Sequence, residues 1–134
     1  MKQLSLFFFI VFTACLIQAQ EEAITLETSS GNLQGTLLLP EIEKPPVVLI
    51  IAGSGPTDRN GNSPSLKSNY LKMLAEGLHK NNIASLRFDK RGIAESASAF
   101  KGGEIELRFE TYINDVEQWI SVLKNDSRFS SVII

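Results

Sequence analysis

The sequence predicts an α/β fold in which an antiparallel hairpin is followed by a parallel sheet with helices on both faces. Three observations lead to this prediction. Residues 47–51 are apolar at every position and rich in β-branched side chains, the composition of a strand buried on both faces. Two later segments repeat apolar residues every three or four positions, as amphipathic helices do. A strand-like segment separates these two helices, and such alternation gives right-handed parallel crossovers.

The segment ahead of this apolar strand predicts the hairpin. Residues 22–28 and 33–39 have the composition of two strands, and the Ser-Ser-Gly-Asn sequence between them is rich in turn-forming residues. The dihedral angles that most residues avoid fall on Ser30-Gly31 or on Gly31-Asn32. Pro40 ends the second strand because it has no N–H to donate to a sheet.

Helices and strands then alternate along the rest of the chain. A helix is predicted over 67–80, and Asn81-Asn82 can end it in the left-handed conformation. Residues 83–88 form the next predicted strand, and residues 89–104 form a long loop of polar and small residues. A second amphipathic helix is predicted over about 108–124, with Trp119 in its buried stripe. The sequence then stops three residues into another apolar strand.

Residues 1–20 have the pattern of a secretory signal peptide. A positively charged start is followed by an apolar run that is too short for a comfortable transmembrane helix. Cleavage after Ala19 or Gln20 would leave residues 21–134 as the folded domain. An uncleaved anchor and lipid attachment at Cys15 are the alternatives. We therefore expect a secreted or periplasmic protein with no stable membrane span once the signal is removed.

Composition narrows the classes of function. Hydrophobic residues make up 43% and charged residues 21% of the 134 residues, as in ordinary globular domains. The formal net charge is −2 and no basic run occurs, so we expect no nucleic-acid partner. The single cysteine, Cys15, lies in the signal segment, so the mature chain has no disulfide and no cysteine ligand or nucleophile. We expect neither a metal nor a cofactor.

The apolar strand runs directly into a glycine-rich loop. Gly53-Ser54-Gly55-Pro56 falls beyond the carboxyl end of a strand, where open α/β sheets bind ligands. A dinucleotide loop would need a third glycine where Asp58 stands, and no P-loop spacing occurs. A turn that binds nothing is a second interpretation. The third is an oxyanion hole, in which backbone N–H groups stabilise developing negative charge.

Two stretches together carry a resemblance to a known family. They are residues 47–62, VVLIIAGSGPTDRNGN, and residues 71–96, LKMLAEGLHKNNIASLRFDKRGIAES. This pattern resembles the N-terminal part of an α/β-hydrolase, in the branch of secreted or periplasmic esterases and serine-aminopeptidase-like proteins. The resemblance covers roughly residues 30–134. It implies a small-molecule ester or peptide-like amide as substrate and cleavage through an acyl-enzyme.

By this resemblance the oxyanion hole falls on Gly53 and Ser54, with the Ser54 backbone N–H as donor. Gly55 and Pro56 are expected to shape this loop, and Asp58 and Arg59 to hold it as a local ion pair or turn cap, with a substrate contact as the alternative. The resemblance implies that Asp89, Arg91 and Gly92 form a mainly structural turn after the next strand, with a substrate contact again as the alternative. The chain departs from the family pattern at two positions. Ala52 replaces the usual histidine, and Ala94 replaces the second glycine of the turn. We expect the turn after Gly92 to be altered.

The sequence provides no complete catalytic machinery. In α/β-hydrolases the serine sits in G-x-S-x-G and is followed along the chain by an acid and a histidine. No such motif occurs, and the single histidine, His79, falls on a helix that precedes any such motif. The resemblance places the nucleophile after Ile134, so we expect the N-terminal portion of a longer hydrolase, inactive by itself. The alternatives are a non-catalytic, truncated hydrolase-like binding module and, more distantly, a nucleotide-binding protein.

Overall fold

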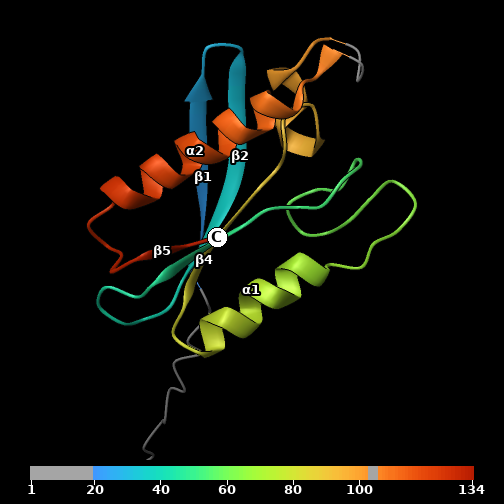
Figure 1. The fold of residues 1–134 in the computed structure, drawn as a ribbon. Helices are drawn as coiled ribbons and strands as arrows, with labels where there is room; N and C mark the ends of the chain where they lie inside the picture. The colour runs from blue at the N-terminus through green and yellow to red at the C-terminus, as the bar shows by residue number, and fades with distance from the viewer. Residues whose placement is uncertain (1–19, 103–105) are drawn as a thin grey trace, which may run out of the picture.

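The structure, a computed structural model, describes residues 20–102 and 106–134, which form a five-stranded sheet with helices packed on it. The strands lie in the order β1-β2-β4-β3-β5 (Figure 1). They are β1 Gln20–Thr28, β2 Gly31–Leu39, β3 Val47–Ile50, β4 Ala84–Phe88 and β5 Val132–Ile133. The helices are α1 Tyr70–Lys80 and α2 Phe109–Asn125, with a short 3-10 helix η1, Ala94–Ala99. The predicted signal peptide lies outside the described residues, apart from Gln20.

The predicted hairpin is confirmed, and it forms one side of a mixed sheet. β1 pairs antiparallel with β2, from Gln20 opposite Leu39 to Thr28 opposite Gly31. β2 pairs antiparallel with β4, whereas the pairs β4–β3 and β3–β5 are parallel as predicted. Gly31 has a φ of 136°, and a Cβ there would lie 2.6 Å from the Ala99 Cα. Only glycine therefore fits at the start of β2.

The two helices cover opposite faces of the sheet, as predicted (Figure 1). Because side chains alternate along a strand, Leu37 and Leu38 of β2 enter different cores. The core on the α2 side is the larger and contains Leu33, Leu37, Leu49, Leu86, Phe88, Trp119 and Leu123. The core on the α1 side contains Leu38, Ile50, Ala52, Leu71 and Ala75. Each fully buried leucine or phenylalanine contributes about 1.5–3 kcal/mol.

Helix α1 begins three residues later than predicted. Asn69, just ahead of it, has a left-handed φ of 53°, and its N–H donates to the Asn62 Oδ1 at 2.9 Å. Residues 67–69 therefore belong to the glycine-rich loop rather than to the helix. The end of the helix matches the prediction, because Asn82 has a left-handed φ of 61°.

The apolar stripes are wider in the sequence than the buried faces in the structure. In α1 the side chain of Leu74 is exposed, and in α2 those of Phe109 and Ile113 are exposed. The predicted strand over 47–51 is one residue too long, because β3 ends at Ile50. Ile51 is 41% exposed where the chain leaves the sheet.

The loop predicted over 89–104 contains an unpredicted element, η1. Its first residue, Ala94, has a left-handed φ of 44° at the position where the resembling family has glycine. This conformation costs an alanine about 1 kcal/mol. Further along η1, the buried Ser96 accepts a hydrogen bond at its Oγ from the Gln34 N–H of β2, at 2.9 Å. The turn after β4 is thereby fastened to the hairpin.

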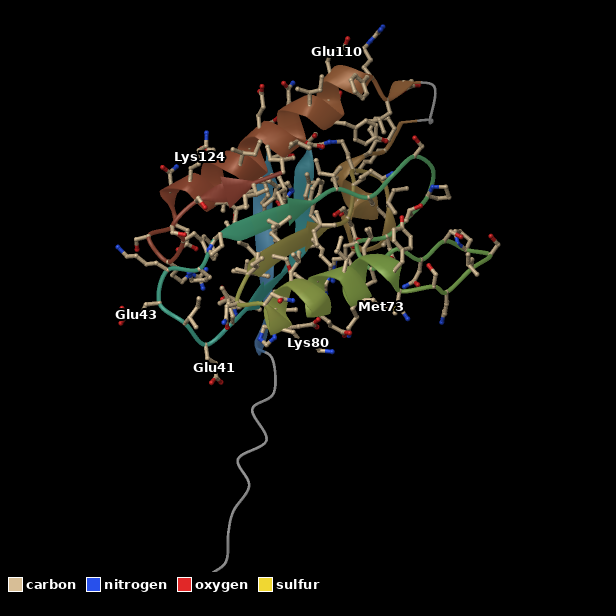
Figure 2. All side chains as sticks on the ribbon, turned by 60° about the horizontal axis from the view of Figure 1, so that its bottom comes forward. Glu41, Glu43, Met73, Lys80, Glu110 and Lys124 are labelled. Carbon is tan, nitrogen blue, oxygen red and sulfur yellow. The ribbon has the colours of Figure 1, made fainter. Side chains whose placement is uncertain are left out.

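Other charged side chains project from the surface of the molecule (Figure 2). Figure 2 shows Glu110 and Lys124 at opposite ends of α2, where their charges suit the positive N-terminal and negative C-terminal ends of the helix dipole. Glu41 and Glu43 project from the loop between β2 and β3. The exposed Met73 lies on α1.

Candidate functional site

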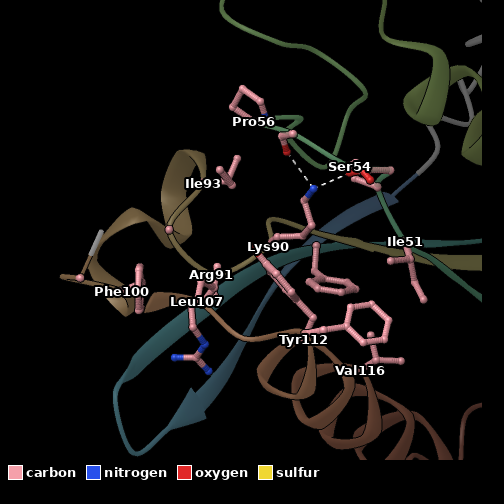
Figure 3. Close-up of a pocket in the computed structure, with 17 residues that line it drawn as sticks. Ile51, Ser54, Pro56, Lys90, Arg91, Ile93, Phe100, Leu107, Tyr112 and Val116 are labelled. Atoms are coloured by element: carbon pink, nitrogen blue, oxygen red, sulfur yellow. Dashed lines mark hydrogen bonds between the residues drawn. The ribbon is translucent and has the colours of Figure 1, made fainter. Parts of the chain in front are cut away.

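A cavity of about 790 Å³ lies at the carboxyl ends of β3 and β4 (Figure 3). Its walls come from the glycine-rich loop after β3, the turn after β4 and the first turns of α2. The lining residues are 51–56, Phe88, 90–93, Phe100, Gly102, Leu107, Phe109, Tyr112 and Val116. Parallel sheets bind ligands at this end, and the volume suits a small molecule.

The glycine-rich loop forms one wall of the cavity with exposed backbone. Gly55 turns the chain with a φ of 81°, and Pro56 follows it. The backbone N–H groups of Gly53, Ser54 and Gly55 donate to no acceptor among the described residues. A Cβ at Gly53 would meet no atom of the described residues within 4 Å, so close packing does not explain why glycine stands there. The loop therefore presents free backbone donors beside a cavity.

The rest of the loop is folded around Asp58. Its Oδ1 accepts hydrogen bonds from the backbone N–H groups of Asn60 and Asn62, both at 2.8 Å. The Asp58 N–H donates to the Asn62 carbonyl, also at 2.8 Å. Asn62 in turn donates through Nδ2 to the Asn69 Oδ1, just ahead of α1. Asp58 holds the shape of the loop and does not line the cavity.

Asp89 fastens this loop to the turn after β4. Its Oδ1 accepts from the Arg59 backbone N–H and its Oδ2 from the Arg59 Nη1, both at 2.7 Å. The Glu95 N–H also donates to Oδ2, at 3.2 Å, and the Glu95 Oε2 accepts from the Arg59 Nη2 at 2.6 Å. Burial raises the pKa of Asp89, and the hydrogen bonds and charge of Arg59 oppose the rise.

Arg91 is fully engaged in structural contacts, because all five guanidinium N–H groups have acceptors. Nε and Nη2 donate to the two carboxylate oxygens of Asp115 in α2, at 3.0 and 2.5 Å. The other three donate to the Ala99 carbonyl, the Ser30 Oγ and the Thr28 Oγ1. Arg91 thus ties the hairpin turn, η1 and α2 together and has no donor left for a ligand.

Gly92 follows with a φ of 81° and donates its N–H to the Ser96 carbonyl at 3.1 Å. A Cβ at this position would meet only Phe100, at 3.6 Å or more. Backbone conformation rather than space therefore requires glycine at this wall of the cavity.

Lys90 is the charged side chain that reaches the Gly53–Gly55 part of the loop. Its Nζ donates to the carbonyl oxygens of Gly53 and Gly55, the latter at 2.8 Å (Figure 3). The residue is only 9% exposed, and burial lowers the pKa of its ammonium group. Lys90 therefore joins the turn after β4 to the loop after β3 at the cavity wall.

The described lining of the cavity contains neither a histidine nor a carboxylate. Ser54 is the one serine in that lining, and no base accompanies it there. His79 lies in the last turn of α1, outside the cavity lining, and is partly buried. Within residues 20–102 and 106–134, no three His, Cys, Asp or Glu side chains gather to hold a metal ion. None of the helices in this part of the chain is long and apolar enough to span a bilayer.

Two residues of this site were not predicted to be important, Lys90 and Asp115. Asp115 leaves a signal in the sequence, because an acid four residues before Trp119 interrupts the buried stripe of an amphipathic helix. Such an acid requires a buried cation, and Arg91 supplies it. The contacts of Lys90 leave no such signal, because they join it to carbonyls 35 and 37 residues earlier in the chain.

Comparison with known proteins identifies the fold. No family model matches the chain, and no curated protein matches it. Among solved structures, it is similar to the α/β hydrolase GrgF from Penicillium sp. sh18, with a TM-score of 0.58 and 15% identity over 80% of this chain. It is also similar to a cold-adapted esterase from an Arctic intertidal metagenomic library, with a TM-score of 0.53 and 18% identity over 86% of this chain. The chain spans 33% of the first structure and 49% of the second, so it contains part of their fold.

Proposed function

We propose that this chain, whose fold is that of part of an α/β hydrolase, carries the oxyanion loop of a secreted serine hydrolase. The substrates are carboxylic esters or small peptide-like amides. The observation that carries the proposal is the row of backbone N–H groups at Gly53, Ser54 and Gly55, which donate to no acceptor among the described residues and lie beside the cavity at the end of β3. These donors suit the oxyanion that forms when a nucleophile attacks an acyl carbon.

The reaction requires groups beyond those of the described cavity. A general base takes the proton from a serine hydroxyl of the full-length protein as the serine oxygen attacks the substrate carbonyl carbon, and the carbonyl oxygen becomes the oxyanion that the Ser54 N–H stabilises. Collapse of this intermediate breaks the bond to the alcohol or amine, which leaves with a proton from the general base. Water then releases the acid from the acyl-enzyme. The described lining of the cavity has no such serine–base pair, so we expect the chain of residues 21–134 alone to be inactive.

Hydrolysis of p-nitrophenyl acetate and butyrate by the full-length protein tests the proposal. Ser54→Ala retains the backbone N–H and should retain kcat within about threefold. Ser54→Pro removes the N–H and should lower kcat about 10²–10³-fold, the usual loss for one oxyanion donor. A thermal transition near that of the wild type is the folding control for both variants. Equal activity of the two variants would refute the assignment of Ser54.

A serine-reactive fluorophosphonate probe separates the loop from the nucleophile. The probe should label the full-length protein and its Ser54→Ala variant equally, and it should leave the chain of residues 21–134 unlabelled. Labelling that Ser54→Ala abolishes would make Ser54 itself the nucleophile and would overturn the oxyanion assignment.

A non-catalytic binding module is the second candidate. The absence of histidine and carboxylate from the described cavity lining favours it, because no general base is then at hand. A full-length protein that neither hydrolyses these esters nor reacts with the fluorophosphonate would support the binding module and contradict the hydrolase.

Export is the remaining part of the proposal. Gln20 is the first residue of β1 and pairs with Leu39, so signal cleavage after Ala19 or Gln20 leaves this strand almost entire. Mass spectrometry of the protein recovered from its producing cells should find Gln20 or Glu21 at the N-terminus. A diacylglyceryl adduct on Cys15 would replace secretion with a lipid anchor.

A further inference from the structure

Within the described lining of the cavity, Lys90 is the one residue whose side chain joins the turn after β4 to the loop after β3. Its neighbours in the chain are both immobilised, Asp89 by Arg59 and Arg91 by Asp115. The backbone of Lys90 is therefore fixed by contacts other than those that its own ammonium group makes with Gly53 and Gly55, one of them to α2 and the other to the far part of the same loop. An anchored side chain of this kind can impose a conformation on a flexible partner.

The glycine loop has few other constraints on its carbonyl groups. Among the described residues, Lys90 is the only donor to the Gly53 carbonyl. The Gly55 carbonyl accepts from Lys90 and from the Thr57 N–H, at 2.8 and 2.9 Å. With Gly55 at a φ of 81°, this part of the chain has little intrinsic preference for a single conformation.

The Gly53 carbonyl and the Ser54 N–H belong to one planar trans peptide unit, in which they point in opposite directions. A bond that fixes the Gly53 oxygen therefore fixes the direction of the Ser54 N–H. The bond is charge-assisted, since the donor is an ammonium group. It also polarises the peptide unit, and a polarised amide is a stronger donor through its own N–H.

We propose that Lys90 is a positioning residue for the oxyanion loop, where its ammonium group orients and polarises the Ser54 N–H. This inference rests on the proposed function, because it gives that N–H its catalytic importance. Lys90 itself touches neither the nucleophile nor the substrate in this role. It acts through the peptide unit between Gly53 and Ser54.

Protonation of Lys90 makes the inference testable by pH. Burial lowers its pKa from the ordinary 10.5, so the ammonium loses its proton at a less alkaline pH than an exposed lysine. The other titratable side chains that line the cavity are Arg91, held by Asp115, and Tyr112 of α2. Asp89, adjacent in the chain, is bound to Arg59. As pH rises through the Lys90 pKa, the Ser54 N–H should become a weaker and less ordered donor.

The test uses the full-length protein and three variants. Lys90→Met removes the charge and keeps most of the side-chain volume, whereas Lys90→Arg keeps the charge. Lys72→Met is the control, because Lys72 lies on α1 with a side chain 40% exposed and its Nζ 3.9 Å from Glu21. Lys90→Met should lower kcat for p-nitrophenyl butyrate about 10²-fold with KM changed less than about threefold. Lys90→Arg should recover at least about a tenth of the lost activity, and Lys72→Met should match the wild type.

A second readout does not depend on activity. In ¹⁵N NMR spectra the amide signals of Ser54 and Thr57 should titrate with the Lys90 side chain, below pH 10.5, and Lys90→Met should abolish this titration. Ser54 and Thr57 amide signals that do not follow the Lys90 titration would overturn the inference even if Lys90→Met failed to fold.

The two proposals fail in different ways. If the wild type hydrolyses esters and Lys90→Met retains its kcat, the oxyanion loop stands and the role of Lys90 is refuted. If the wild type does not hydrolyse esters while the Ser54 amide titrates with Lys90, the hydrolase proposal is refuted and the contact alone remains.

Discussion

Removal of the Asp115 carboxylate should be among the most destabilising single changes in this part of the chain. The side chains of Asp115 and Arg91 are 3% and 5% exposed, and two N–H···O bonds of 3.0 and 2.5 Å join them. Asp115→Ala leaves a buried guanidinium without its counter-charge and with two unpaired N–H groups. Orphaned buried charges of this kind cost about 3–5 kcal/mol, a large share of the roughly 5–15 kcal/mol that stabilises a domain.

Urea denaturation of the full-length protein, followed by circular dichroism, measures this cost. With an m-value of about 2 kcal/mol/M, the midpoint should fall by about 1.5–2.5 M. Glu117→Ala is the matched control, since Glu117 is exposed on the same helix and its loss should change stability by less than about 0.5 kcal/mol.

The double variant Arg91→Met/Asp115→Leu distinguishes the orphaned charge from lost packing. It removes both charges together, so it should recover most of the stability that Asp115→Ala loses. A double variant as unstable as Asp115→Ala, or an Asp115→Ala protein within about 1 kcal/mol of the wild type, would refute the reasoning.

Four further outcomes follow from the structure. The hydrogen bonds from Arg128 hold the pKa of Asp126 below its usual 3.8. Their contribution to stability is therefore present above pH 3.8 and is lost as pH falls through the lower pKa of the folded state. Asp126→Asn should lower the free energy of unfolding at pH 7 but not at pH 2, and urea titrations at both pH values would measure this. Gly53→Ala should leave the melting temperature within about 1 °C, because its Cβ meets open space, yet lower kcat in the ester assay if substrate approaches the backbone there. Gly55→Ala should cost about 1 kcal/mol from its φ of 81°, a fall of a few degrees in melting temperature that calorimetry would detect. Gly31→Ala should lower expression of folded protein severely, because the added Cβ would lie 2.6 Å from η1 backbone, and an unchanged melting temperature would contradict that contact.

The sequence predicts best those helices and strands whose own residues follow a recognisable hydrophobic pattern. The two helices repeat at three and four residues, and β3 is continuously apolar, so each is visible without knowledge of its neighbours. Helix η1 has no such pattern, because Ala94–Ala99 consists of small residues and one acid, and its helical turns depend on contacts with β2. The antiparallel pairing of β2 with β4 could not be predicted from the sequence either, since strand order depends on the whole sheet.

In the candidate site, too, some features could be located from the sequence and others could not. The glycine-rich loop could be located from its place after a buried strand, because that rule depends on sheet topology alone. The contacts that hold this loop could not be located from the sequence, because Asp89 and Lys90 bind residues that lie 30 or more positions earlier in the chain. Long-range contacts of this kind leave the local pattern of residues unchanged, and Asp115 is detectable only because it interrupts a pattern.

The position of β3 at the centre of the parallel part of the sheet has a consequence for protein synthesis. Its pairing with β5 joins Val47 to Val132, about 85 residues later in the chain. At about 5–20 residues per second, the ribosome needs roughly 4–17 s to make that intervening stretch. For this interval one hydrogen-bonding edge of the apolar strand has no partner, whereas the hairpin strands can pair as soon as they emerge. A factor that shields nascent chains would therefore act first at residues 47–50.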